Sequence, residues 1–501
     1  MFSVIYTPTE GDAIQNYSRL FRKPEGCFLN INDQERIDES LSAFGVVEDI
    51  DYIVVSDGEE VSYESTNLGE LYLSRQQKIL GIGDQGVGAI LISVAKLVIT
   101  TLCAGIHPSR QLPVVLDCGT DNEELLSDDL YLGLRQHRER GQKYDDFVDK
   151  FVQAARKRFP KAYIHLYVKP FQWSNNTNQL SEDFGLSNAR RILNRYQSQI
   201  PCFNDDIQGT GCVTLAAMLA ALQVSSVKLE DVRVVIFGSG TAGIGIADQI
   251  AETIATETNK SKDDASKQIW CIDKPGLLVK SLDQKLTDGQ RSFARDDKDW
   301  SDNERDLQSV IKKVQPHVLI GTSTKPGAFT EDSIREMARH VERPIVFPLS
   351  NPTRLHEAKP DDLYKWTEGK ALVATGSPFE PVNYKGTEYE IAECNNSTCF
   401  PGIGLGAVLS QCRLMSKKML VAAVEALKAE SPALKDSNKP LLPDVQNVRE
   451  ISVNIAAAVI KCAVEEGLAQ QDGIPDNDSE LREWIQAQMW EAGYRPLVGE
   501  K

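Results

Sequence analysis

The segment FNDDIQGTG, residues 203–211, places two adjacent carboxylates, Asp205 and Asp206, between an apolar run and a glycine turn. A second acidic pair, Glu182 and Asp183, occurs upstream in SEDFGLSNARRIL. Carboxylate oxygens are the ligands that hard cations such as Mg²⁺ and Mn²⁺ prefer. An acid pair before a helix also stabilises the helix N-terminus by charge alone. The spacing therefore leaves a metal site and solvated surface charge equally open.

A lysine within an apolar segment is a second candidate for chemistry. Lys96 lies in GVGAILISVAKLVITTLCAGI, residues 86–106, which has the length and composition of a buried helix. Burying a lysine is costly unless it is paired, and burial favours the neutral amine, which is the form that acts as a general base. The alternative is a lysine whose ammonium group extends back to solvent.

A glycine-rich turn has the spacing of a dinucleotide site. It follows a strand expected over 232–237 and opens a helix expected over 244–254. This context provides a tight turn, close approach of the backbone to a pyrophosphate, and a helix N-terminus that faces it. The alternative is a glycine turn that only packs a helix on a sheet. The expected cofactor-binding residues of this turn are Gly238, Ser239, Gly240 and Gly243.

An acidic residue ends the next expected strand, QIWCID. Asp273 is placed there to accept hydrogen bonds from the ribose hydroxyls of an adenosine. An acid at this position favours NAD over NADP, but Lys274 follows at once. The sequence therefore predicts NAD and keeps NADP as an alternative.

The elements that position these residues alternate between strands and helices. From residue 210 onward, apolar strands such as VRVVIF, HVLIGT and RPIVFP alternate with helical segments, which predicts a doubly wound, parallel Rossmann-type sheet. Upstream, DYIVVSDG and LPVVLDCGT are expected strands and 144–160 an amphipathic helix, so a second α/β domain is expected. Beyond residue 400 the pattern is helical. We therefore expect an α/β substrate domain over 1–204, a nucleotide-binding domain over 205–395 and a helical C-terminal segment over 396–501 that packs back on the first domain.

Composition excludes several classes of protein. The net charge of −17 over 501 residues argues against a partner that is a nucleic acid or an anionic membrane. We expect no apolar segment of the roughly 18 residues that cross a bilayer. Ten cysteines without a CxxC pair indicate reduced, mostly buried thiols, and the six histidines lack metal-ligand spacing. We expect no targeting segment in the sequence as it stands, because its first residues lack a basic start followed by an apolar run.

Several segments together resemble the malic enzyme family. They occur in the order found in that family, from residue 4 to beyond residue 410. The segments are VIYTPTEGDAIQNYSRLFRKPEG, ILGIGDQGVGAILISVAKL, LPVVLDCGTDN, EDFGLSNARRIL, FNDDIQGTG, VIFGSGTAGIGIA, PLSNPTRLHEA, ATGSPFEPV and CFPGIGLGAVLS.

The resemblance implies a role for each candidate residue. Glu182, Asp183 and Asp206 match the acids that bind the divalent metal, Mn²⁺ or Mg²⁺. Lys96 matches the general base, and Asp205 lies beside it and influences its charge. Further matching positions are Tyr6 for the general acid, and Asn351 with Asn395 or Asn396 for holding substrate and nicotinamide. The implied reaction is oxidative decarboxylation of (S)-malate to pyruvate and CO₂ with reduction of NAD(P).

The resemblance also leaves alternatives open. A malolactic enzyme shares these motifs, and a catalytically impaired NAD-binding member is a further reading. Relative to the family, the chain starts late, and residues 60–78 and 166–181 are insertions, either surface loops or translated introns. A homo-oligomer, dimer or tetramer, is implied if the shortened start allows it. The compartment stays open between mitochondrial matrix and cytoplasm, and so do allosteric effectors.

Overall fold

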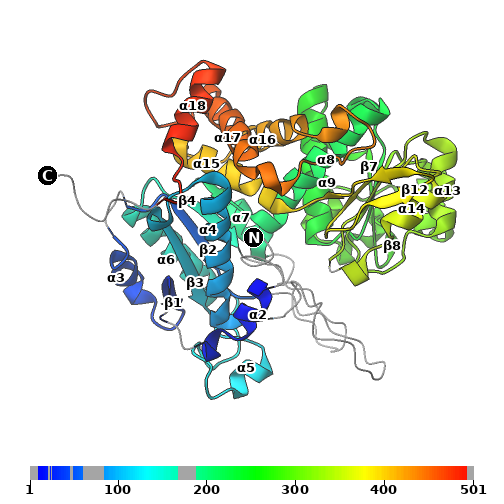
Figure 1. The fold of residues 1–501 in the computed structure, drawn as a ribbon. Helices are drawn as coiled ribbons and strands as arrows, with labels where there is room; N and C mark the ends of the chain where they lie inside the picture. The colour runs from blue at the N-terminus through cyan, green and yellow to red at the C-terminus, as the bar shows by residue number, and fades with distance from the viewer. Residues whose placement is uncertain are drawn as a thin grey trace.

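The computed structural model contains two large sheets, each built mainly of parallel strands, together with a layer of helices (Figure 1). The structure describes residues 9–20, 23, 25–45, 49–59, 84–167, 188–351 and 353–493. Tyr6, Glu182 and Asp183 lie outside these residues, as does most of both insertions. The first two residues of the second insertion, 166 and 167, end a strand of the first sheet.

The first sheet holds five parallel strands in the order β1-β3-β2-β4-β5. Helices connect successive strands, as parallel pairing requires. The strands are β1 (Cys27–Asn30), β2 (Tyr52–Ser56), β3 (Gln111–Asp117), β4 (Tyr163–Tyr167) and β5 (Cys202–Phe203). The helices are α2 (Thr9–Gln15), α3 (Ile37–Ser42), α4 (Ile90–Ala104), α5 (Glu123–Ser127), α6 (Gln142–Arg158) and α7 (Asn188–Tyr196).

The second sheet has seven strands in the order β14-β11-β10-β9-β6-β7-β8. All neighbours are parallel except β7 and β8. From β6 the chain adds β7 and β8 on one side of the sheet. It then crosses back and adds β9, β10, β11 and β14 on the other side, which confirms the expected doubly wound, Rossmann-type sheet. The strands are β6 (Val234–Phe237), β7 (Ile269–Asp273), β8 (Gly276–Leu277), β9 (Val318–Gly321), β10 (Ile345–Pro348), β11 (Leu372–Thr375) and β14 (Ala392–Glu393).

The helices of this half cover both faces of the sheet, and β12 (Val382–Tyr384) pairs with β13 (Thr387–Tyr389) in a separate hairpin. The helices are α8 (Thr210–Ser225), α9 (Thr241–Thr258), α10 (Lys262–Ser266), α11 (Asp288–Arg291), α12 (Leu307–Val314), α13 (Glu331–His340) and α14 (Pro360–Trp366). Helix α9 begins three residues earlier than the 244 expected, because its first turn starts within the glycine motif.

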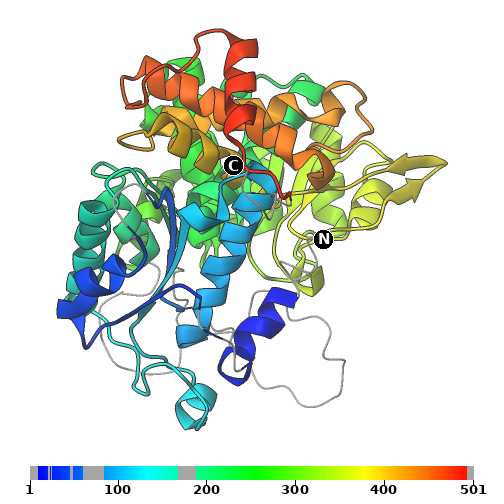
Figure 2. The same cartoon turned by 60° about the vertical axis from the view of Figure 1, so that its left-hand side comes forward.

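The C-terminal helices pack on both halves of the molecule (Figure 2). Helices α15 and α17 contact α4 of the first half, whereas α16 contacts α8 of the second. Close approach of α15 to α17 depends on glycines, since a Cβ at Gly402 or Gly406 would lie 2.7 or 2.8 Å from α17 side chains. These helices are α15 (Phe400–Ser410), α16 (Lys417–Ala429), α17 (Val448–Glu465) and α18 (Asp478–Gln488).

Two helical segments reach the length and hydropathy of a membrane span, so the expectation that none would do so was wrong. They are 86–104, with mean hydropathy 2.2, and 205–225, with mean hydropathy 1.5. The most apolar stretches of the two segments are 78% and 83% buried, as in the core helices of a globular domain. All ten cysteines are free and eight are buried, which confirms the expectation of buried thiols.

Candidate active site

A buried ion pair joins the two halves of the molecule. The Lys96 Nζ lies 2.5 Å from Asp205 Oδ2, and the two side chains are 2% and 0% exposed. Lys96 comes from α4, which packs on the first sheet, whereas Asp205 begins the helical segment that leads into α8. Lys96 is therefore a paired, buried lysine, and its ammonium group does not extend to solvent.

Helix α4 fixes the position of Lys96. Its buried face runs along β2 and β3, and Ser93 donates a hydrogen bond of 3.1 Å to the Val114 carbonyl of β3. The helix ends at Gly105, whose φ of 63° and backbone N–H to the Thr101 carbonyl form a left-handed cap. A lysine in the middle of so buried a helix cannot withdraw from the site.

The acid pair lies in a π-helical turn, Asp205–Gly209, where the sequence suggested a simple glycine turn. The Asn204 side chain accepts a hydrogen bond from Ile207 N (3.0 Å), and Gln208 Oε1 accepts one from Asn204 N (2.9 Å). Gly209 leaves room for the carboxylate, because a Cβ there would lie 2.0 Å from Asp205 Oδ1. Such single-turn π segments frequently occur at functional sites.

Asn396 holds this turn from the other side. Its Nδ2 donates to the Asp205 carbonyl at 3.1 Å and to Thr210 Oγ1 at 3.2 Å. Asn395 instead bonds locally: its Oδ1 accepts from Ser397 N at 3.0 Å, and its Nδ2 donates to Glu393. Of the two asparagines that sequence could not separate, Asn396 is therefore the one that contacts the acid pair.

Aromatic side chains enclose the ion pair. The Lys96 Nζ lies 4.8 Å from the centre of the Phe400 ring, an arrangement that favours a cation. The same ring lies 5.6 Å from the ring of His165, and Tyr52 Oη lies 3.1 Å from His165 Nδ1. All four side chains are buried. The pair is thus shielded from water by side chains from β2, β4 and α15.

Burial shifts the pKa of both Tyr52 and His165, which are hydrogen-bonded to each other. The pKa of His165 falls from 6.5 to about 4, first because burial removes the imidazolium from water, while the nearby Asp205 charge opposes the shift. Burial also raises the pKa of Tyr52 well above its usual value of 10.0. His165 is therefore a neutral imidazole beneath the ion pair at neutral pH.

The donor set of the turn fits a hard cation. Asp206 is half-buried next to Asp205, and Asp205 Oδ1 is buried without a hydrogen-bond donor among the described residues. Within the described ranges no group of three or more His, Cys, Asp or Glu side chains is arranged to hold a metal ion. Glu182 and Asp183, the other acids of the expected set, fall outside those ranges. Asp206 is thus the one described member of that set.

The glycine motif forms a cradle at the carboxyl ends of β6 and β9. Gly238 has a φ of 102°, and a Cβ there would lie 2.4 Å from the Ser323 backbone nitrogen. A Cβ at Gly243 would lie 2.0 Å from the Gly238 carbonyl oxygen. Gly240 precedes the first residue of α9, Thr241, whose Oγ1 is buried and has no partner among the described residues. These features fit a pyrophosphate at a helix N-terminus, at the point where the strand order reverses.

Ser239 and Asp273 lie together at this edge. Ser239 is buried, and its Oγ donates to the Ile272 carbonyl at 3.0 Å, so it is part of the turn and its hydroxyl is already used. Asp273 ends β7, and its Oδ2 accepts from Gln290 Nε2 at 3.2 Å. Burial raises the pKa of Asp273, while a hydrogen bond from the Lys274 backbone opposes the shift. Gln290, which sequence reasoning missed, also donates to the Ser239 carbonyl and so fixes both residues.

The remaining expected residue, Asn351, follows β10 on the same edge of the sheet. It is exposed, and its Oδ1 accepts a hydrogen bond from Ser377 Oγ. Sequence reasoning missed Tyr52 and His165 completely. The available signal was a histidine within the apolar strand AYIHLY, close in sequence to the acids.

Comparisons with known proteins show which family the two halves of the chain match. The family model described as the malic enzyme N-terminal domain matches residues 1–62 and 71–197, and the one described as the malic enzyme NAD-binding domain matches 207–464. The NAD-dependent malic enzyme of Schizosaccharomyces pombe is 47% identical over 99% of this chain and 83% of its own. The NAD-dependent malic enzyme 3 of Bacillus subtilis is 44% identical over 99% of this chain and 82% of its own.

Solved structures show the same fold. The malic enzyme of Entamoeba histolytica covers 97% of this chain, with 80% of its own chain matched, at a TM-score of 0.59 and 21% identity. The malic enzyme of Pyrococcus horikoshii also covers 97% of this chain, with 88% of its own matched, at a TM-score of 0.59 and 20% identity.

Proposed function

Because the chain belongs to the malic enzyme family, we propose that it oxidatively decarboxylates (S)-malate to pyruvate and CO₂, with reduction of NAD and with a divalent metal. The buried pair of Lys96 and Asp205 carries this proposal. Lys96 lies where the first sheet meets the dinucleotide domain, which supports a role as the base that hydride transfer requires.

Lys96 acts on the hydroxyl proton of malate. When Lys96 is deprotonated, its neutral amine takes this proton from the C2 hydroxyl as hydride leaves C2. The ammonium that results stays 2.5 Å from Asp205 Oδ2 and over the Phe400 ring, so both groups stabilise the product of the proton transfer. Asp205 in turn is held by Asn396 and by the π-helical turn, which preserves this geometry.

The groups that bind to the site supply the remaining chemistry. Asp206, together with Glu182 and Asp183, would hold Mn²⁺ or Mg²⁺, which supplies positive charge to the substrate oxygens on which negative charge develops. The cradle of Gly238, Gly240 and Gly243 would hold NAD, which accepts the hydride. Tyr6 is proposed to return a proton to C3, and Asn351 to help hold the substrate.

The NAD preference rests on two observations. Asp273 ends β7, where its carboxylate can accept hydrogen bonds from a ribose and would repel a 2′-phosphate. The relatives from Schizosaccharomyces pombe and Bacillus subtilis are both named NAD-dependent. We further propose that the chain assembles as a homo-oligomer, a dimer or a tetramer, which sedimentation equilibrium measures directly.

The test is to incubate the purified chain with (S)-malate, Mn²⁺ and NAD, and to follow NADH absorbance and organic acids together. Metal-dependent NADH formation with equimolar pyruvate supports the proposal, and Lys96→Met is the matched inactive control. Lactate without released NADH would instead identify a malolactic reaction. Binding of NAD without either product would identify a catalytically impaired member of the family.

A further inference from the structure

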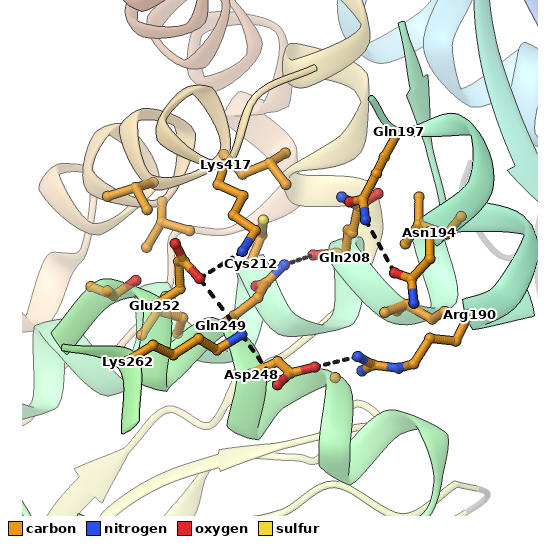
Figure 3. Close-up of a pocket in the computed structure, with 18 residues that line it drawn as sticks. Arg190, Asn194, Gln197, Gln208, Cys212, Asp248, Gln249, Glu252, Lys262 and Lys417 are labelled. Carbon is orange, nitrogen blue, oxygen red and sulfur yellow. Dashed lines mark hydrogen bonds and ion pairs between the residues drawn. The ribbon is translucent and has the colours of Figure 1, made fainter. Parts of the chain in front are cut away.

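A cavity of about 150 Å³ lies behind the catalytic turn, between α7, α8, α9 and α16 (Figure 3). Its apolar wall includes Leu215 from α8 and Leu420, Val421 and Val424 from α16. A space of this volume accommodates a body of about six carbon atoms. None of its lining residues belongs to the glycine cradle or to the Lys96–Asp205 pair, so it is a separate space.

A chain of ion pairs borders the cavity, as Figure 3 shows. Arg190 of α7 pairs with Asp248 of α9, and Lys417 Nζ lies 2.8 Å from a Glu252 oxygen. Lys262 lies between them, 3.5 Å from Asp248 and 3.6 Å from Glu252. Three cations thus face two carboxylates. The border carries a surplus positive charge, although the whole chain has a net charge of −17.

Three polar groups of the lining have unused hydrogen-bonding capacity within the described part of the chain: two donors, on Thr253 and Arg190, and one acceptor, Gln249 Oε1. Thr253 is 0% exposed, and its Oγ1 has no hydrogen-bond partner there. The Arg190 Nη2 is also buried and has no partner among those residues. Leaving such groups unsatisfied costs stability. A hydroxyl and a guanidinium nitrogen can both donate to an oxygen anion, so the two groups point to the same ligand chemistry.

The cavity shares a wall with the catalytic turn. Ile207 and Gln208 line it, and they follow Asp205 and Asp206 directly within the π-helical segment. The Gln208 carbonyl accepts a hydrogen bond of 3.0 Å from Gln249, which also lines the cavity. A Cβ at Gly245 would lie only 3.2 Å from the Ile207 carbonyl oxygen, so α9 and the turn are in close contact. A molecule in the cavity therefore contacts the segment that positions both acids.

We propose that this cavity binds a small monocarboxylate with an apolar body, and that occupancy shifts the catalytic turn and alters turnover. The apolar body lies against α8 and α16, and the carboxylate lies beside the Lys417 ammonium, where it accepts a hydrogen bond from the unused donor of Arg190 or of Thr253. The effect on turnover rests on the proposed malate activity, whereas the binding does not.

The first experiment measures binding of pentanoate to the full chain by isothermal titration calorimetry, with saturating NAD. Pentanamide, which has the same shape without the charge, is the matched ligand. Lys417→Met removes one border cation, and Val421→Phe fills the cavity. We expect saturable pentanoate binding to the native chain, weakened about tenfold or more in both variants and for pentanamide, because a charge-assisted contact or the space itself is lost.

The matched protein control is Lys418→Met. Lys418 is the next residue on α16, with a side chain 67% exposed that pairs with Glu466 and does not line the cavity. This variant should bind pentanoate as the native chain does. The absence of pentanoate binding, or equal affinity in the native chain, Lys417→Met and Val421→Phe, would overturn the proposed site and indicate a cavity that holds water only.

Initial rates of malate oxidation test the effect on the turn. A pentanoate concentration that just saturates the native chain should change kcat at least about twofold in the native chain and in Lys418→Met. The same change in Lys417→Met should require a concentration about tenfold higher or more. Calorimetric binding without a change in rate would overturn the coupling to the turn. A chain that does not oxidise malate at all would contradict the proposed function while the calorimetry still decides the site.

Discussion

Lys96 and Asp205 form a buried ion pair, with 2.5 Å between Nζ and Oδ2, although the two residues lie 109 positions apart in the sequence. Neither side chain reaches solvent. Removing two charges from water costs several kcal/mol, and their mutual attraction repays this cost only while both are present. The pair is therefore better explained by a chemical role than by a contribution to stability.

Removal of one member of the pair should destabilise the protein more than removal of both. Asp205→Ala is expected to lower the free energy of unfolding by about 3–5 kcal/mol, because it takes the carboxylate from a buried ammonium. Lys96→Met combined with Asp205→Leu should recover much of this loss while remaining inactive. Denaturant titration and kcat measure the two effects.

The control for this comparison is the exposed pair of Arg110 and Asp51, whose side chains are 44% and 24% exposed. Asp51→Ala should cost only about 0–1 kcal/mol, since water screens this pair. If Asp205→Ala and Asp51→Ala lower the free energy of unfolding equally, burial of the Lys96–Asp205 pair does not make its loss more costly.

The close contact at Gly243 should make NAD binding sensitive to a single methyl group. Gly243→Ala places a Cβ 2.0 Å from the Gly238 carbonyl oxygen, so the turn must move away from α9. We expect the Kd for NAD to rise about tenfold or more. Fluorescence titration measures this, with Gly493→Ala as the control, because a Cβ there meets nothing within 4 Å. An unchanged Kd would place the pyrophosphate elsewhere.

Asp273 should set the preference between NAD and NADP. Asp273→Ser removes the charge that repels a 2′-phosphate while leaving a hydrogen-bonding side chain at the end of β7. The ratio of kcat/KM for NAD to that for NADP should fall about tenfold or more. Gln290→Ala, which removes a partner of Asp273 but no charge, should change the ratio less. A ratio that responds equally to both variants would exclude charge as the cause.

His165 should make the stability depend on pH in acid. Its pKa falls from 6.5 to about 4 on folding because of burial, so the unfolded chain binds more protons between these values. The contribution of His165 to the free energy of unfolding is therefore complete above pH 6.5 and is lost as the pH falls toward 4. His165→Gln should remove up to about 3 kcal/mol of this decrease.

His317 and His356, whose pKa values burial also lowers to about 4, should contribute to the remaining decrease. The measurement is the midpoint of urea unfolding at several pH values, with the exposed His137→Gln as the control for loss of a histidine. If His165→Gln and the native protein lose stability in parallel, His165 is protonated in the folded state, contrary to this account.

The sequence could predict most elements because they depend on local patterns. The buried helix around Lys96, the strand that ends at Asp273 and the alternation after residue 210 all follow from apolar periodicity and turn residues. The Rossmann-type sheet follows from that alternation, since parallel strands require crossover helices. The boundaries were less exact: β6 begins at Val234, two residues later than expected, because hydrogen bonding to β7 and β9 decides where a strand starts.

The site is only partly local. The residue types of Asp205, Asp206 and Lys96 suggested metal binding by the carboxylates and base chemistry by the lysine. Their spacing alone was also compatible with acids exposed to solvent and with a lysine that extends to solvent. Packing of α4 against the turn decided in favour of a buried pair. The same packing placed Tyr52 and His165 beneath it. A histidine within the apolar strand AYIHLY was a local signal for His165, whereas no local pattern indicated Tyr52.

The amino-acid sequence by itself determined the family, the two α/β halves and the residue types of the site, because periodicity and motifs act over short distances along the chain. Only the tertiary structure decided the π-helical turn, the hydrogen bond from Asn396 to Asp205, and the cavity behind them. These features arise where helices distant in sequence meet. Their geometry depends on side-chain volumes across an interface, which a linear pattern does not contain.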